Sequence, residues 1–236
     1  MATRATKQDA TPRPFTGFAD TSRSFFKALD EHQDRDWYNA HKAEFEAGWS
    51  GPMASLLTEV RGRLADAYKG VTLREPKVFR LQRDVRFSLD RTPYKTNVSG
   101  VLSVKGPGTA TDSPAAVYLQ LGLENFGGAG LYGMQGETLE RYRAAVLDAR
   151  SGAALAKITD ALEAQGYTLG AMETLKTAPR GVDKDHPRIH LLKRKGLVAM
   201  FPELPVETIT ETSFADWVTE RAVEAAPLVR WLEKHA

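Results

Sequence analysis

Residues 77–104 read KVFRLQRDVRFSLDRTPYKTNVSGVLSV, and this stretch decides the fold. Its first part, residues 77–87, alternates strictly in side-chain type, as in a strand whose successive side chains point to opposite faces. SLDRTPYK supplies a turn, and residues 97–104 alternate again. The sequence therefore predicts a strand, a turn and a second strand. The first strand has one face with Phe79, Leu81, Arg83, Val85 and Phe87, and another with Val78, Arg80, Gln82, Asp84 and Arg86.

Other periodic segments surround this stretch. In residues 22–68, apolar side chains recur every three or four positions, which is typical of helices. AAVYLQLGLENF (115–126) alternates and predicts a third strand, and KGLVAMF (195–201) predicts a fourth. GGAGLYG (127–133) between them is interpreted as a glycine-rich loop. Residues 213–235 are helical in pattern.

Together these elements predict one α+β domain. Its sheet is expected to be antiparallel or mixed, with four or more strands, and to be flanked by N- and C-terminal helices. We place this domain at residues 15–236, because no internal repeat or clear linker divides them. Residues 1–14 are charged and poor in apolar side chains, so we expect a disordered tail there.

The composition excludes several classes of protein. The chain has 236 residues and no cysteine, which excludes thiol nucleophiles, disulfides, zinc fingers and protein-ligated iron–sulfur clusters. A reducing compartment is then the default, so we expect a cytoplasmic protein. No apolar run is long enough to span a bilayer, and the N-terminus lacks the apolar core of a secretory signal. We therefore expect a soluble protein without a membrane partner.

Charge is distributed unevenly along the chain. The net charge of +2 does not favour a general polyanion binder. Residues 74–95, however, carry seven basic side chains against three acidic ones, and residues 176–195 carry seven against two. Two basic segments thus lie on an acidic background. If they meet in space, they form a positive pocket or groove.

Arg83 is the unusual residue of the first basic segment, because its predicted face is otherwise apolar. Burying a guanidinium costs several kcal/mol unless it is paired, so Arg83 needs an acid or an anion on that side. On the opposite face, Asp84 lies between Arg80 and Arg86 and is placed to orient both or to act as a base. Lys95 follows the proline turn and could reach the same anion as a point charge. A solvated, salt-bridged sheet face is the competing interpretation.

These side chains define a candidate site. Asp84 and Tyr94 are the candidate catalytic residues, with Tyr94 as a hydrogen-bond donor. Asp185 and His186 are the residues considered as metal ligands, but Pro187 disfavours a helix that would align them, so a polar loop is favoured and no metal is assigned. The candidate ligand-binding residues carry guanidinium, ammonium or hydroxyl groups: Arg80, Arg83, Arg86, Lys95, Tyr118 and Arg180.

The segment RLQRDVRFSLDRTPYKTN resembles the signature of an uncharacterised family, Domain of Unknown Function 2461. The similarity continues in DRDWYNAHKAEFE, YLQLGLENFGGAGLYG and LKTAPRGVDKDHPRIHLLKRKG, in the same order, from about Phe15 onward. The resemblance implies no established activity. It implies that both basic segments belong to one signature, matched here at Arg83, Asp84, Arg86, Phe87, Asp90, Pro93, Tyr94, Lys95, Pro179, Arg180, Gly181, Asp185, His186 and Pro187.

The function we expect is recognition of a phosphate- or carboxylate-bearing small molecule in an arginine-lined pocket, with catalysis left open. One alternative is a nucleic-acid-binding protein that uses the same basic residues as a surface stripe. Another is a structural or partner-binding module whose charges form internal salt bridges. The sequence assigns no cofactor and no oligomeric state.

Overall fold

The computed structural model describes residues 14–84, 86, 90–104 and 115–236. The expected tail at residues 1–14 therefore lies almost wholly outside the described residues. The strands form one antiparallel sheet with the order β1-β2-β3-β4-β6-β5. This confirms the predicted α+β class. The strands are β1 (Lys77–Val78), β2 (Asn97–Ser103), β3 (Ala115–Gly122), β4 (Phe126–Leu131), β5 (Thr168–Gly170) and β6 (Leu197–Met200).

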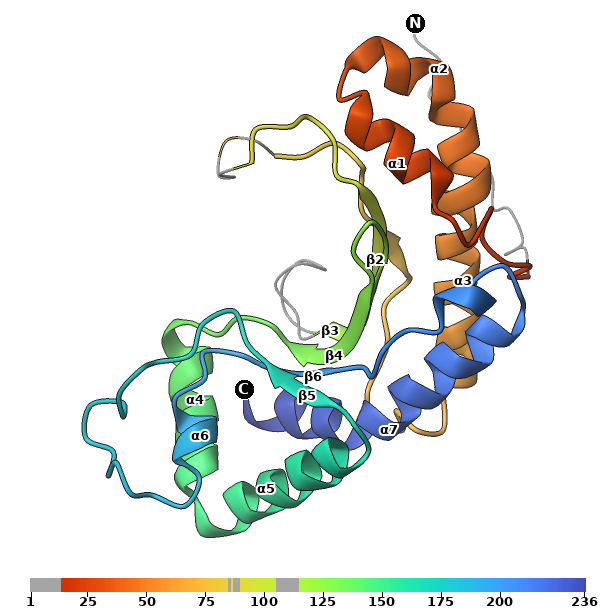
Figure 1. Ribbon diagram of the computed structural model, residues 1–236. Coiled ribbons are helices and arrows are strands. Elements are labelled where there is room, and N and C mark those ends of the chain that lie inside the picture. The colour runs from red at the N-terminus through yellow and green to blue at the C-terminus, as the bar shows by residue number, and fades with distance from the viewer. Residues whose placement is uncertain (1–13, 85, 87–89, 105–114) are drawn as a thin grey trace, which may run out of the picture.

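Helices from both ends of the chain flank this sheet, as expected. Figure 1 shows a curved sheet, with α3 and α7 on its outer side and no described helix over the concave side of β2 and β3. The helices are α1 (Ser24–Glu31), α2 (Arg35–Phe45), α3 (Gly51–Arg63), α4 (Gly136–Leu147), α5 (Ala149–Ala164), α6 (Ile189–Leu192) and α7 (Ser213–His235), with a π-helix η1 (Glu46–Ser50) and a 3₁₀ turn η2 (Val206–Thr208).

The core lies between the outer face of the sheet and the helices. Alternate residues of β2 and β3 point into it and are buried: Val98, Leu102, Val117, Leu119 and Leu121. Gly100 lies in the same row, and a Cβ there would come within 2.6 Å of the Leu57 side chain of α3. The missing side chain thus lets α3 approach β2 closely. The intervening residues of both strands necessarily face the concave side.

The predicted strand at residues 77–87 is wrong in length. Only Lys77 and Val78 form β1, and the chain then leaves β2 and pairs with its own returning arm. Backbone bonds from Arg83 to Pro93 and from Lys95 to Leu81 close this arm into a hairpin. Consequently Leu81 enters the core, whereas Phe79 does not join the core cluster. Residues 85 and 87 lie outside the described residues.

The predicted glycine-rich loop at residues 127–133 is also wrong, because its first part is strand β4 in the interior of the sheet. The glycines permit close approach there. A Cβ on Gly130, which has φ of 141°, would lie 2.2 Å from the carbonyl oxygen of Leu197. A Cβ on Gly127 would lie 2.7 Å from the Phe201 ring. Close strand and ring packing, and not a turn, thus accounts for these glycines.

Helices α2 and α3 are joined without a break by the π-helix η1. Pro52 has no N–H and so cannot donate to the carbonyl of Gly48 one turn earlier. That carbonyl instead accepts a hydrogen bond of 3.0 Å from the backbone N–H of Ala19. The N–H of Gly51 donates to the carbonyl of Glu46, five residues earlier, which is the wider turn of a π-helix. Pro52 thus leaves the Gly48 carbonyl available to bind the segment before α1.

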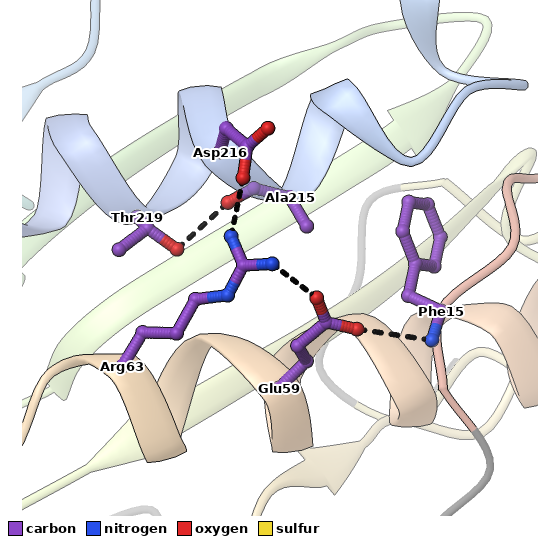
Figure 2. Close-up of polar contacts among 6 residues, drawn as sticks. All are labelled: Phe15, Glu59, Arg63, Ala215, Asp216 and Thr219. Carbon is purple, nitrogen blue, oxygen red and sulfur yellow. Dashed lines mark hydrogen bonds and ion pairs between the residues drawn. The ribbon is translucent and has the colours of Figure 1, made fainter.

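A polar network ties the same N-terminal segment to α3 and α7. Figure 2 shows the Arg63 guanidinium between the carboxylates of Glu59 and Asp216, with which it forms ion pairs. The second oxygen of Glu59 accepts a hydrogen bond of 3.1 Å from the backbone N–H of Phe15. Glu59 and Arg63 of α3 together therefore link the N-terminal segment at Phe15 to α7 at Asp216.

We predict that Glu59→Ala destabilises the protein by about 1 kcal/mol, because it removes one bond to the backbone and one partner of Arg63. For a chain of this size, that corresponds to a decrease in Tm of roughly 2–4 °C. Calorimetry or a denaturant titration measures the change. The matched control is Glu44→Ala, at an exposed position of α2. Equal stability of the two variants would contradict the role assigned to Glu59.

Candidate functional site

Arg83 finds its partner inside its own hairpin. Its guanidinium forms an ion pair of 2.8 Å with Asp90 and donates to the carbonyls of Thr92 and Tyr94. The Arg83 side chain is 24% exposed, so the acid that its position required is present. Hydrogen bonds from Thr92, followed by the nearby Arg83, lower the pKa of Asp90. These contacts give Arg83 a structural role in closing the hairpin.

Asp84 and Arg86 also pair with each other. The Arg86 guanidinium donates to both carboxylate oxygens of Asp84, at 2.9 and 2.7 Å, and both residues are exposed. These bonds lower the pKa of Asp84 to about 2, with a smaller contribution from Arg80. A carboxylate held ionised in this way is a poor proton acceptor at neutral pH. The geometry favours a role in orienting Arg86 over a role as a base.

Tyr94 lies on the core side of the hairpin. Its ring is buried and contacts the ring of Tyr38 in α2, with centroids 4.6 Å apart. Its backbone N–H donates to the side-chain oxygen of Gln33 at 3.0 Å. Burial is the main cause of the raised pKa of Tyr94. Tyr94 thus anchors the hairpin against the N-terminal helices.

The second basic segment does not meet the first. In Figure 1, the loop between β5 and α6 lies at the opposite end of the curved molecule from the two arms of the hairpin, residues 79–84 and 90–96. This loop contains Arg180, Asp185 and His186, and Arg180 is exposed. The two basic segments therefore do not converge on a single concavity.

Several cations of the second segment have structural partners. Arg188 donates to the carbonyls of Val146 and Leu147, at the end of α4. Arg194 donates to the carbonyl of Leu169 at 2.8 Å, and Lys195 pairs with Glu173. Within the described parts of the chain, no group of three or more His, Asp or Glu side chains is arranged to hold a metal ion.

The structure gathers a different set of side chains on the concave face of the sheet. We call this set the concave-face cluster: Lys77, Phe79, Lys95, Ser99, Tyr118, Gln120 and Phe126. The register explains how it forms. Ser99 lies opposite Gln120, and Gln120 lies opposite Phe126, so these three residues make one row across β2, β3 and β4. Phe79 extends this row, because its backbone N–H donates to the carbonyl of Ser99.

Two ammonium groups lie near the same aromatic ring at one end of the cluster. The Nζ atoms of Lys77 and Lys95 lie 5.3 and 5.8 Å from the centroid of the Phe79 ring. Lys95 is half-buried, and no carboxylate among the described residues pairs with it. Burial, followed by the charges of Arg83 and Arg80, lowers the pKa of Lys95. This ammonium group is thus close to other positive charges and has no acidic partner among the described residues.

Hydroxyl and amide groups occupy the centre of the cluster. The hydroxyl of Tyr118 donates to the side-chain oxygen of Gln120 at 3.0 Å. Ser99 and Gln120 are buried. Burial raises the pKa of Tyr118, while its hydrogen bond with Ser99 acts in the opposite direction. Tyr118 therefore stays protonated at neutral pH and remains a hydrogen-bond donor.

One known protein family matches most of the chain. The family model described as conserved hypothetical protein (DUF2461) matches residues 21–231. This chain belongs to DUF2461. No curated protein and no solved structure matches it. Among the described helices of this DUF2461 protein, none is both long and apolar enough to cross a membrane.

Of this cluster in the DUF2461 chain, the candidate site predicted from the sequence contains only Lys95 and Tyr118. It does not include Lys77, Phe79, Ser99, Gln120 or Phe126. Alternation predicts that Phe79 and Leu81 lie on the same face of one strand, because they are two positions apart. The chain changes its pairing partner from β2 to the returning arm of the hairpin between these residues, so the alternation of faces does not continue. A usable signal was present in β2. Since Val98, Gly100 and Leu102 form its core row, the intervening Ser99 must face the other side.

We predict that Lys95 titrates below the ordinary lysine value of 10.5, and that Arg80→Met raises its pKa by removing a like charge. NMR titration of ¹³C-methylated lysines measures both quantities. Lys69→Met, which removes an exposed charge after α3, is the control and leaves Lys95 unchanged. If Arg80→Met does not move the Lys95 titration, the electrostatic description of this end of the cluster is wrong.

Proposed function

We propose that this DUF2461 protein binds a phosphate- or carboxylate-bearing small molecule on the concave face of its sheet. The anionic group lies between the ammonium groups of Lys77 and Lys95, with Arg80 as a further source of positive charge. The observation that carries the proposal is the half-buried ammonium of Lys95, which neighbours two arginines and pairs with no described acid. An anion at this position would offset the repulsion and favour the charged form of Lys95.

The centre of the cluster supplies directional contacts for the same ligand. The Tyr118 hydroxyl has one hydrogen and donates it to Gln120, so it can donate to the anion, or to an oxygen beside it, only by exchanging that bond for one to the ligand. Of the ligand-binding residues expected from the sequence, this assignment retains Arg80, Lys95 and Tyr118. It gives Arg83 and Arg86 a role in shaping the hairpin, because both are ion-paired there. Catalysis is left open, because the two catalytic candidates, Asp84 and Tyr94, have structural contacts in the hairpin.

The two alternative functions are supported by less of the structure. A nucleic-acid stripe needs its cations spread along one continuous surface, whereas the two basic segments lie at opposite ends of the molecule. A structural module needs the charges to be paired internally. That holds for Arg83 and Arg86 but not for Lys95. The cytoplasm remains the compartment we expect, on the absence of cysteine.

We predict that inorganic phosphate, pyrophosphate or citrate raises the Tm of the protein above its value in sodium chloride of equal ionic strength. Lys95→Met should weaken this binding by roughly tenfold to a hundredfold, as expected when one charged hydrogen-bond partner is lost. Thermal-shift titrations measure the effect, and isothermal calorimetry gives the Kd. The matched control is Lys69→Met, which retains wild-type affinity.

Two results would overturn this proposal. One is the same Tm in all these anions as in chloride. The other is unchanged affinity in Lys95→Met. A steep loss of affinity for a single-stranded oligonucleotide with rising salt, without binding of the small anions, would favour the nucleic-acid alternative.

A further inference from the structure

Three aromatic rings form a continuous row across the concave face. The ring centroids of Phe79 and Tyr118 are 6.4 Å apart, and those of Tyr118 and Phe126 are 5.5 Å apart. All three side chains are partly exposed, unlike Phe25, Phe26 and the other aromatic residues of the core. Large rings that remain partly exposed and side by side, rimmed by polar groups, are typical of a binding surface.

The two ends of this row differ in chemistry. At the Phe79 end, Lys77 and Lys95 lie over the ring, so that end is positively charged. At the other end, the rings of Tyr118 and Phe126 are stacked, with an angle of 27° between their planes. No described ammonium or guanidinium group lies over these two rings. The row is thus cationic at one end and flat and aromatic at the other.

We propose that the ligand of the concave face carries a planar aromatic ring beside its anionic group, as a nucleoside monophosphate does. The anion lies at Lys77 and Lys95, and the ring stacks on Tyr118 and Phe126. This inference rests on the proposed function, because it names the class of ligand that the same site takes. Base stacking on an aromatic side chain is worth roughly fivefold to more than a hundredfold in affinity.

The geometry favours a flat ring over an aliphatic group at this position. The centroids of these two rings are 5.5 Å apart, which is more than the roughly 3.5–4 Å of atomic contact, so the stack is offset and part of each face is not covered by the other ring. A planar ring can stack on that part. An aliphatic chain would gain only burial of apolar area there. Replacing one ring by leucine keeps most of the apolar volume but removes the flat face. Such a variant therefore separates stacking from simple burial.

The test compares the affinities of AMP, ribose 5-phosphate and inorganic phosphate, measured by isothermal calorimetry at constant ionic strength. AMP should bind at least about fivefold more tightly than ribose 5-phosphate, since only AMP has a ring to stack. In Phe126→Leu, the affinity for AMP should decrease by about fivefold or more, while that for ribose 5-phosphate stays unchanged. Tyr132→Leu is the matched control, because Tyr132 is 63% exposed and lies beyond the end of β4.

The outcomes distinguish this inference from the proposed function. If ribose 5-phosphate binds as tightly as AMP and Phe126→Leu changes neither affinity, the inference is overturned and the anion site stands. If none of the three compounds binds, the proposed function fails, and the inference fails with it. A short oligonucleotide that binds far more tightly than AMP, with a steep salt dependence, would overturn the assignment to a small molecule.

Discussion

Apolar packing of α3 and α7 against one face of the sheet is the interaction on which the rest of the structure depends. It assigns every second residue of β2 and β3 to the core, and so leaves the others on the concave face. Gly100 allows α3 to lie close to β2, and the glycines of β4 allow close contact with Phe201 and β6. The concave-face cluster is a direct result of this one-sided covering.

Four charged side chains of the hairpin after β1 pair with one another. Arg83 with Asp90, and Arg86 with Asp84, form two ion pairs inside a few residues of chain. Lys95, on the returning arm, is next to this charge but takes no part in the pairing. The local sequence thus holds two kinds of cation. One kind closes the hairpin, and the other faces the sheet with its charge uncompensated by the described residues.

The sequence predicted the fold class well, because alternation and helical spacing are local properties of the chain. It predicted less well where tertiary contact overrides them. Phe79 and Leu81 share one parity, yet they face different surroundings because the chain changes pairing partner between them. The sequence around Gly127 and Gly130 is typical of a loop, since the neighbours that require these glycines, Phe201 and Leu197, are 74 and 67 residues further along the chain. Likewise, no local pattern tells whether Arg180 meets the hairpin.

The hydrogen bond from Ala19 to Gly48 depends on the bend between α2 and α3. Its acceptor is left free by Pro52 only in the helical bend of η1, so the segment before α1 has a partner there only after α2 and α3 have joined. Local opening of this segment would break its bonds to Gly48, Glu59 and Ile209 but none of the bonds within α3. We therefore expect the Ala19 amide to exchange its hydrogen with solvent before the amides of α3 do. By leaving the Gly48 carbonyl without a donor in its own helix, Pro52 thus makes docking of the N-terminal segment depend on the formed bend between α2 and α3.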